Sequence, residues 1–312
     1  MRHTFQSFWI GDTLSPYEGL ALRSFIDHGH RVQLYCYTSR LNAPRGVELR
    51  DASVVLPKER CFSYKAGFGA GSFSACSNLF RYLLLRRYGG WWIDTDVICL
   101  TDRIPEFESF FALEDRDFIN GAVLHFDASD PLLDHCLRET LQAGRDVSWG
   151  QIGPRLLTRK AKELGRFDEA RRASDCYPLH WSAALELLDP QRKRALKRCT
   201  RRSLMVHLWN EVLRQADICK ALLPPRGSYL RTLADRHPVD GWTGQYVVQE
   251  RRAGAAIPDG LQHGALPLRY AARYWMADKM RGRSRPGREF TVGAPAWRGA
   301  PAEPLRSGMR TH

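Results

Sequence analysis

Apolar runs of strand length and one helical pattern alternate over about the first forty residues of the chain. Residues 5–10 and 31–37 each read as a strand, and between them apolar residues recur at near-helical spacing over residues 15–28. Ser15 is expected to cap this helix and Gly29 to end it. A strand, a helix and a second strand in close succession are typical of a βαβ unit, which predicts a mostly parallel sheet.

A second helix and strand then lead to a pair of acidic residues. The glycine- and aromatic-rich residues 65–73 predict a loop, and a serine after it caps a helix that runs to Tyr88. Gly89-Gly90 is expected to end this helix, because glycine accepts the left-handed conformation found at helix C-termini. Residues 91–93 predict a buried strand that leads directly into Asp94-Thr95-Asp96. Further strands are predicted over residues 97–100, 110–114 and 121–126, and further helices over residues 131–143 and 151–164. Residues 204–209 read as a late strand or as a turn into a short helix.

This alternation predicts an α/β fold, in which a Rossmann-type, mostly parallel sheet is flanked by helices. Residues 1–225 are expected to form the main domain. The composition changes after that point, since residues 226–312 contain 15 Lys and Arg against 7 Asp and Glu, with proline, glycine and arginine dominating after residue 281. We expect a basic C-terminal extension that is partly disordered, with one helix over residues 268–280.

Composition narrows the class of protein. Hydrophobic residues make up 44% of the 312 residues, enough for a sizeable core, and the net charge of +13 favours anionic partners. The eight cysteines are widely spaced and form no Cys-x-x-Cys pair, which disfavours a zinc ribbon and fits a reducing cytosol. The chain has no signal-peptide-like amino terminus and no apolar run of about 18 residues, so no transmembrane helix is expected.

Asp94 and Asp96 are the strongest candidates for chemistry. In an extended segment, residues two apart project to the same side, so their carboxylates would repel unless a cation lies between them. Mg²⁺ and Mn²⁺ accept such oxygen ligands and leave positions open for phosphate oxygens. Such an ion would act as a Lewis acid that stabilises a departing nucleoside diphosphate. The alternative is an ordinary acidic turn.

The segment Ser77-Asn78-Leu79-Phe80-Arg81-Tyr82, continued by Tyr88-Gly89-Gly90-Trp91-Trp92-Ile93-Asp94-Thr95-Asp96, resembles the glycosyltransferases with a DxD sugar-binding region. These are family 32-like enzymes, with mannosyltransferase and α-1,4-galactosyltransferase relatives. Weaker similarity at residues 8–11, 119–122, 153–158 and 207–210 extends the resemblance over roughly residues 5–212. The resemblance implies a GT-A fold over residues 1–225, a nucleotide-sugar donor, a divalent metal and retention at the anomeric carbon.

The resemblance also implies roles for individual residues. Asp94 and Asp96 would contact the metal and the donor, and Arg81 would reach the donor sugar or orient the acidic turn. Asn78 occupies a position that is usually Asp in the family, which keeps an acceptor oxygen but loses the charge. The alternatives are a helix cap for Asn78 and a plain ion-pair residue for Arg81.

Other expected substrate contacts are Trp9, Tyr82, Gly90, Asn120 and Trp209. Trp9 would stack on the nucleotide base, because a flat base is matched by a flat apolar side chain, or would belong to the core. Asn120 would hydrogen-bond sugar hydroxyls or serve a turn. His207 is a candidate third metal ligand, with a structural histidine as the alternative.

A covalent mechanism with retention would need a carboxylate that faces the anomeric carbon. Glu114, Asp115 and Asp117 lie in the expected active-site loop, and nothing in the sequence selects one of them. By resemblance we favour a front-face reaction in which the leaving phosphate helps to deprotonate the acceptor.

The function expected from the sequence is a metal-dependent hexosyltransferase that uses a UDP- or GDP-sugar and extends a glycan or a lipid-linked acceptor such as surface polysaccharide or lipopolysaccharide. It would be cytoplasmic, with the basic extension on the inner face of an anionic membrane or simply solvated. One rival is a polyanion-binding protein whose acidic turn is incidental, although no nucleic-acid-binding motif supports it. The other is a transferase relative that binds a nucleotide sugar without turnover.

Overall fold

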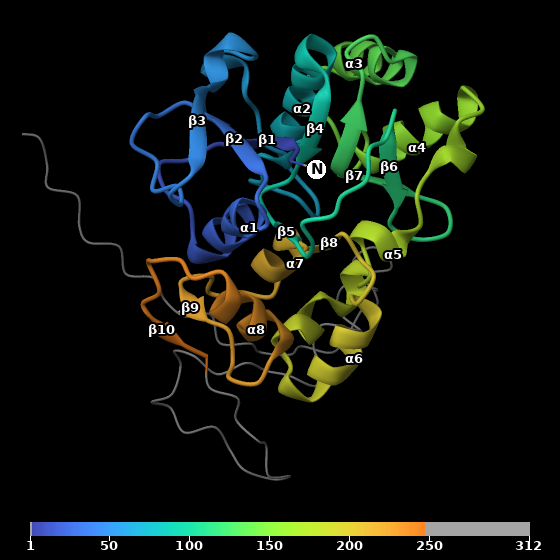
Figure 1. Ribbon diagram of the computed structural model, residues 1–312. Coiled ribbons are helices and arrows are strands. Elements are labelled where there is room, and N and C mark those ends of the chain that lie inside the picture. Colours follow the sequence, from blue (N-terminus) through green and yellow to red (C-terminus); the bar gives the residue numbers. More distant parts are fainter. Residues whose placement is uncertain (1, 247–312) are drawn as a thin grey trace, which may run out of the picture.

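The computed structural model describes residues 2–246 and is built around a six-stranded sheet in the order β3-β2-β1-β4-β7-β6 (Figure 1). Strands β1 to β4 pair in parallel, whereas β7 runs antiparallel to both β4 and β6. The predicted α/β fold, with a mostly parallel sheet flanked by helices, is confirmed. The strands are β1 (Thr4–Trp9), β2 (Arg31–Cys36), β3 (Val47–Asp51), β4 (Gly90–Ile93), β6 (Phe110–Leu113) and β7 (Ile119–Phe126).

Three helices cover one face of the sheet: α2 (Ser74–Tyr88), α3 (Pro131–Ala143) and α4 (Pro154–Glu163). Their apolar side chains and those of the sheet form the first core cluster, in which Phe80 of α2 stacks on Phe8 of β1 at 3.8 Å between ring centroids. The predicted stop of α2 is confirmed, because Gly89 follows the helix with a φ of 62°. α2 therefore ends where β4 begins. The side of α2 that faces the sheet lies beside the acidic turn, which follows the other end of β4.

The opposite face is covered by α1 (Pro16–Asp27) and by a small antiparallel ribbon, in which β5 (Val97–Cys99) pairs with β8 (Met205–His207). α1 begins at Ser15 as predicted, with a capping box in which Ser15 and Glu18 satisfy each other's backbone amides. Two short helices, α5 (Ala173–Cys176) and α7 (Asn210–Gln215), pack beside the ribbon. The ribbon brings residue 207 next to the end of β4.

A third core cluster lies beyond α1. It joins the 3-10 helix Trp181–Leu188, α6 (Lys193–Cys199) and α8 (Tyr229–Arg236), and the two-stranded sheet of β9 (Leu222–Leu223) and β10 (Gly244–Gln245) lies beside them. Leu230 and Leu233 of α8 are buried in it, so residues 226–246 pack against the rest of the chain. The rest of the predicted extension, including the helix expected over residues 268–280, lies outside the described residues.

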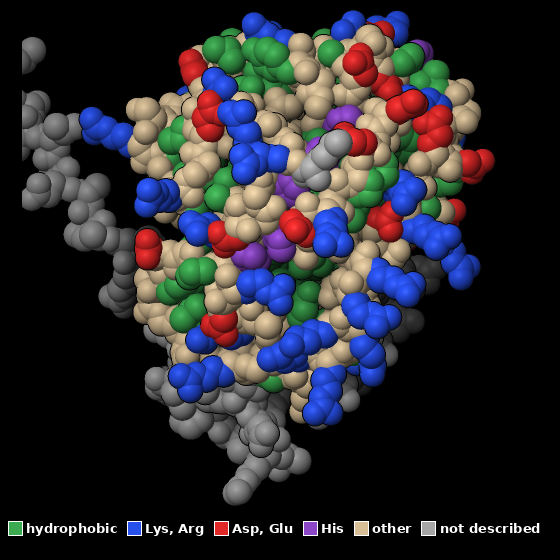
Figure 2. All heavy atoms as spheres, in the orientation of Figure 1, with side chains coloured by type: hydrophobic (Ala, Val, Ile, Leu, Met, Phe, Trp, Pro, Cys, Tyr) green, Lys and Arg blue, Asp and Glu red, His purple; other side chains and the backbone are tan. Residues whose placement is uncertain are grey.

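Basic side chains gather on part of the surface. Figure 2 shows Lys and Arg residues over the lower part of the face that it presents, in the region of α6 and α8. The exposed basic residues of α6 and the turn after it are Arg194, Lys197, Arg198, Arg201 and Arg202. Within residues 2–246, none of the helices is both long and apolar enough to span a membrane.

Candidate active site

The acidic turn joins β4 to β5. The backbone amide of Asp94 donates to the carbonyl of Ala122 on β7 at 2.8 Å, and the amide of Val97 closes the turn on the Asp94 carbonyl at 3.2 Å. After this turn the chain leaves the main sheet and continues as β5 of the β5–β8 ribbon. The two carboxylates consequently lie at the carboxyl end of β4, where open α/β sheets bind their ligands.

Arg81 of α2 fixes the first carboxylate. Its guanidinium donates to both oxygens of Asp94, at 2.9 and 3.3 Å, and also to the carbonyl of Gly121. The indole Nε1 of Trp92 donates to the same Asp94 carboxylate at 2.8 Å, and the guanidinium lies over the Trp92 ring. The Arg81 side chain is only 5% exposed. Its hydrogen bonds therefore fix the orientation of the Asp94 carboxylate from the interior of the protein.

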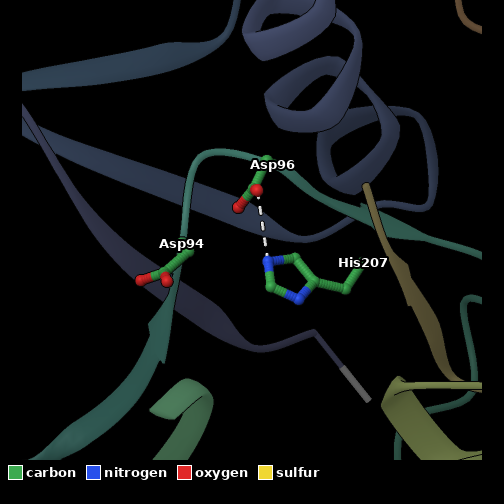
Figure 3. A group of neighbouring side chains, drawn as sticks. All are labelled: Asp94, Asp96 and His207. Carbon is green, nitrogen blue, oxygen red and sulfur yellow. Dashed lines mark ion pairs between the residues drawn. The ribbon is translucent and has the colours of Figure 1, made fainter. Parts of the chain in front are cut away.

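The second carboxylate is held from the other side. Oδ2 of Asp96 accepts a hydrogen bond from Nε2 of His207 at 3.1 Å and another from the backbone amide of Asn210 at 2.8 Å. Figure 3 shows the Asp96 carboxylate and the His207 ring facing each other across the turn, with Asp94 beside them at the end of β4. Asp94 is therefore held by Arg81 and Trp92, whereas Asp96 is held by His207 and the Asn210 amide. The two carboxylates border the same space.

These three side chains fit a divalent cation. Asp94, Asp96 and His207 each offer one ligand atom, and the three atoms lie within 4.8 Å of one another. His207 Nδ1 and Asn210 Oδ1 are buried beside them without a hydrogen-bond partner among the described residues. Two carboxylates and one imidazole form a donor set that Mn²⁺ accepts, and unpartnered buried acceptors are costly unless a ligand supplies a partner.

Burial and charge perturb the pKa values of all three groups. Burial raises the pKa of Asp94 above its usual 3.8 although Arg81 opposes it. Burial acts on Asp96 in the same direction, but the charge and hydrogen bond of His207 and the Asn210 amide outweigh it, so the pKa of Asp96 is lowered. Burial alone would lower the pKa of His207, yet Asp96 and then Asp94 and Glu114 raise it above 6.5. Perturbed neighbouring groups of this kind are typical of functional sites.

The raised pKa of His207 sets a pH dependence of stability. In the metal-free protein, the Asp96–His207 pair contributes fully below pH 6.5, and its contribution is lost as the pH rises through the raised pKa of folded His207. We expect wild type to exceed His207→Gln in melting temperature near pH 6 and this difference to shrink as the pH rises through the raised pKa of His207, because Gln keeps a donor but no charge. Thermal melts with a chelator present measure it. A difference that stays constant over this range would contradict the assignment.

The hairpin between β6 and β7 brings a third carboxylate to the site. Glu114 accepts a hydrogen bond from Nδ2 of Asn120 at 2.6 Å, and it lies near enough to His207 to raise the pKa of that imidazole. Burial raises the pKa of Glu114 above 4.5, against the hydrogen bond of Asn120. Asp115, in contrast, is used by its own turn, where it accepts from the amides of Asp117 and Phe118. The structure therefore distinguishes Glu114 from Asp115.

Two residues expected at the donor site lie elsewhere. Tyr82 is buried in the first core cluster with its hydroxyl beside Cys136, because it lies on the side of α2 that faces α3. Gly90 begins β4 with a φ of 86°, at the opposite end of the strand from Asp94, where it serves the turn out of α2. Both residues therefore have structural roles in this fold, and their contact with a substrate stays a prediction.

Trp9, Asn78 and Trp209 have structural partners. Trp9 ends β1, half-buried, with its indole donating to the carbonyl of Thr13 at 3.1 Å. Asn78 lies inside α2 and hydrogen-bonds with Tyr64, so the helix-cap alternative is wrong. Trp209 is buried, donates to the Leu179 carbonyl at 2.9 Å and packs on the His207 ring at 4.1 Å between centroids. Whether any of these residues touches a donor stays a prediction.

Three residues that border the acidic turn were not predicted from the sequence: Asn210, Glu18 and Lys220. The similarity at residues 207–210 included Asn210, but its backbone amide, not its side chain, contacts Asp96. Glu18 was visible in the sequence only as a capping-box residue of α1. No periodicity or spacing connects positions about 200 residues apart, so this contact could not be predicted.

The fold and the site define an α/β domain with an acidic motif at the carboxyl end of a central strand, and two family models match parts of it. The family described as "Glycosyltransferase sugar-binding region containing DXD motif" matches residues 61–111, which include Asp94 and Asp96. The "Alpha 1,4-glycosyltransferase conserved region" matches residues 125–237, which include His207. The chain is therefore similar to the DXD-motif glycosyltransferases over residues 61–111 and to the α-1,4-glycosyltransferases over residues 125–237.

Individual relatives are similar over part of their length. The lactosylceramide 4-alpha-galactosyltransferase of Rattus norvegicus is 26% identical over 146 residues, which are 43% of this chain and 40% of that protein. The alpha-1,4-N-acetylglucosaminyltransferase of Homo sapiens is 29% identical over 116 residues, 37% of this chain and 32% of that protein. The similarity thus spans two fifths or less of these curated relatives. The solved structure of PaToxG glycosyltransferase overlaps 53% of this chain and 69% of its own, with a TM-score of 0.39 and 11% identity.

Proposed function

We propose that this chain is a metal-dependent glycosyltransferase that moves a hexose from a UDP- or GDP-linked donor to a glycan or glycolipid acceptor, with retention at the anomeric carbon. The observation that carries the proposal is the group of Asp94, Asp96 and His207 at the carboxyl end of β4. The match of residues 61–111 to the DXD-motif glycosyltransferases supports it, since the matched region contains both aspartates.

In this proposal, the residues of the site have separate roles in binding and positioning the metal ion. Asp94, Asp96 and His207 hold Mn²⁺ or Mg²⁺, which when bound supplies the Lewis acidity that stabilises the leaving diphosphate. Arg81 keeps the Asp94 carboxylate turned towards the shared space. The imidazole favours Mn²⁺, because Mg²⁺ prefers a shell of oxygen ligands alone.

Glu114 is the carboxylate that we propose faces the sugar. It is largely buried, hydrogen-bonded to Asn120 and next to the metal-ligand group, as a nucleophile or a charge-stabilising group requires. Burial, opposed by the Asn120 hydrogen bond, raises the pKa of this carboxyl above its usual 4.5. The front-face alternative uses the same residue to stabilise positive charge on the sugar.

The acceptor and location are proposed from the relatives and the surface. The names of two relatives specify α-1,4 transfer of galactose and of N-acetylglucosamine, and we propose one of these sugars for this chain. A lipid-linked acceptor at the inner face of an anionic membrane is supported by the exposed basic residues of α6.

The test is a donor panel assayed with and without metal. UDP-galactose, UDP-N-acetylglucosamine, UDP-glucose and GDP-mannose are incubated with protein that has been stripped with a chelator and then resupplied with Mn²⁺ or Mg²⁺. We expect release of the nucleoside diphosphate from one donor, loss of this release on chelation and recovery with Mn²⁺. Tight UDP binding without turnover of any donor would favour a non-catalytic binder, and neither binding nor turnover would overturn the proposal.

A further inference from the structure

Glu18 is a buried carboxylate that helix capping does not explain. It lies in the first turn of α1 with no exposed surface, and one of its oxygens, Oε2, accepts from the amide and the hydroxyl of Ser15. This contact completes the capping box, and glutamine serves a capping box equally well without a charge. A fully buried carboxylate costs several kcal/mol unless its other oxygen is also satisfied.

The second carboxylate oxygen of Glu18 contacts two residues that lie about 200 positions later in the sequence. Oε1 of Glu18 accepts from Nδ2 of Asn210 at 2.7 Å and forms an ion pair with Nζ of Lys220. Lys220 is itself only a quarter exposed, and its charge helps to lower the pKa of Asp96. Glu18 thus joins α1 to two residues that border the metal-ligand group.

Asn210 is the link between Glu18 and the acidic turn. Its backbone amide donates to the Asp96 oxygen that also receives His207 Nε2. The preceding residue, Trp209, has φ 60° and ψ 56°, a left-handed conformation that a large aromatic residue rarely adopts. Such a conformation persists only where surrounding contacts impose it. Here the Trp209 indole is held on the Leu179 carbonyl, and the side chain of Asn210 is held by Glu18.

From this geometry we infer that Glu18 is a positioning residue for the metal site: it fixes Asn210 and Lys220, and through them the turn that presents His207 and the Asn210 amide to Asp96. The inference rests on the proposed metal-dependent function for its role in catalysis. It follows that the amino end of α1 belongs to the site, although no residue of α1 ligates the metal. Outer partners of ligands commonly change metal affinity by about ten- to a hundred-fold when they are lost.

The central variant is Glu18→Gln, with Ser15→Ala as its matched control. Both oxygens of Glu18 accept from donors, whereas a glutamine amide has one oxygen and one NH₂ group, which is a donor. A glutamine therefore cannot accept from Ser15, Asn210 and Lys220 together. Lys220 also loses its counter-charge. Ser15→Ala weakens the same helix cap but leaves the contacts of Glu18 with Asn210 and Lys220 in place. Mn²⁺ affinity is measured by calorimetry and electron paramagnetic resonance on the full chain without nucleotide. We expect Glu18→Gln to weaken Mn²⁺ binding about tenfold and Ser15→Ala to leave it near wild type.

A second readout does not depend on metal. Amide hydrogen exchange of residues 207–212 in chelator should be faster in Glu18→Gln and unchanged in Ser15→Ala, because only the first variant frees Asn210. The double variant Glu18→Gln/Lys220→Met removes both charges and should recover part of the lost Mn²⁺ affinity. Equal loss of affinity in Glu18→Gln and Ser15→Ala, or unchanged exchange in Glu18→Gln, would overturn the inference. Equal Mn²⁺ binding by wild type and Asp96→Asn would instead show that the proposed metal site is wrong.

Discussion

Replacing Asp96 by asparagine should lower Mn²⁺-dependent turnover of the donor by about 1,000-fold, which corresponds to about 4 kcal/mol of transition-state stabilisation. The substitution removes the charge that pairs with His207 and that would hold the cation, while the shape of the side chain is kept. An amide also offers a donor where Asp96 Oδ2 now accepts from both His207 Nε2 and the Asn210 amide. The measurement is the initial rate of nucleoside diphosphate release at saturating Mn²⁺, with the donor that the panel identifies.

Asp115→Asn is the matched control for this prediction. Asp115 lies on the neighbouring hairpin, but its carboxylate accepts from the amides of Asp117 and Phe118. Asparagine forms the same turn, so this variant should retain activity within about twofold. Circular dichroism confirms that both variants are folded. Equal turnover by wild type and folded Asp96→Asn would remove the basis of the proposed mechanism.

The part of the fold that could be predicted is the part determined by local patterns. The helix at residues 131–143 was predicted with the bounds that it has, since Pro131 opens it and Gly144 follows its end. The strands around Asp94 were also predicted, because buried strands next to a Gly-Gly helix stop leave a clear signal. The region between residues 167 and 199 was not predicted, because its short 3-10 and helical turns carry little periodicity.

The candidate site was predictable only along single segments. Asp94, Asp96 and Arg81 lie within one motif, and the structure brings them together as the motif suggests. His207 was a weaker candidate and is brought to the same place by the β5–β8 ribbon. Glu18 could not be predicted, because its partners lie about 200 residues away and the contact exists only after folding.

Tyr82 and Gly90 show that residues of one linear motif can face different parts of the structure. Tyr82 follows Arg81 directly, yet α2 turns about 100° per residue, so one side chain faces the sheet and the other faces α3. Gly90 precedes Asp94 by four residues on one strand, and that length separates the two ends of β4. Within a helix or strand, neighbouring residues of a motif serve different surfaces, so only the direction of each side chain assigns it to the site.

Loss of Arg81 should strongly destabilise the folded protein. Its guanidinium makes two hydrogen bonds to Asp94 and one to the Gly121 carbonyl, and it lies over Trp92, almost fully buried. Arg81→Met fills most of the volume but leaves the Asp94 carboxylate without its counter-charge. We expect a loss of about 3–5 kcal/mol, because the penalty of an unpaired buried charge is added to the lost hydrogen bonds. For a chain of this size the melting temperature should fall by roughly 10 °C, measured by calorimetry in chelator.

The comparison that isolates the buried pair uses the same helix. Arg86→Met, five residues further along α2, removes an exposed guanidinium that pairs with Asp134 at 3.6 Å and donates to the Ala128 carbonyl at 2.9 Å. Because both contacts are exposed, it should cost less than about 1 kcal/mol. The double variant Arg81→Met/Asp94→Asn should be more stable than the sum of the single losses predicts, since neutralising Asp94 removes the unpaired charge. Strict additivity of the two substitutions would mean that Arg81 stabilises the fold through packing on Trp92 and not by holding Asp94. In that case the orientation of the first metal-binding carboxylate would depend on the Trp92 indole and the turn itself.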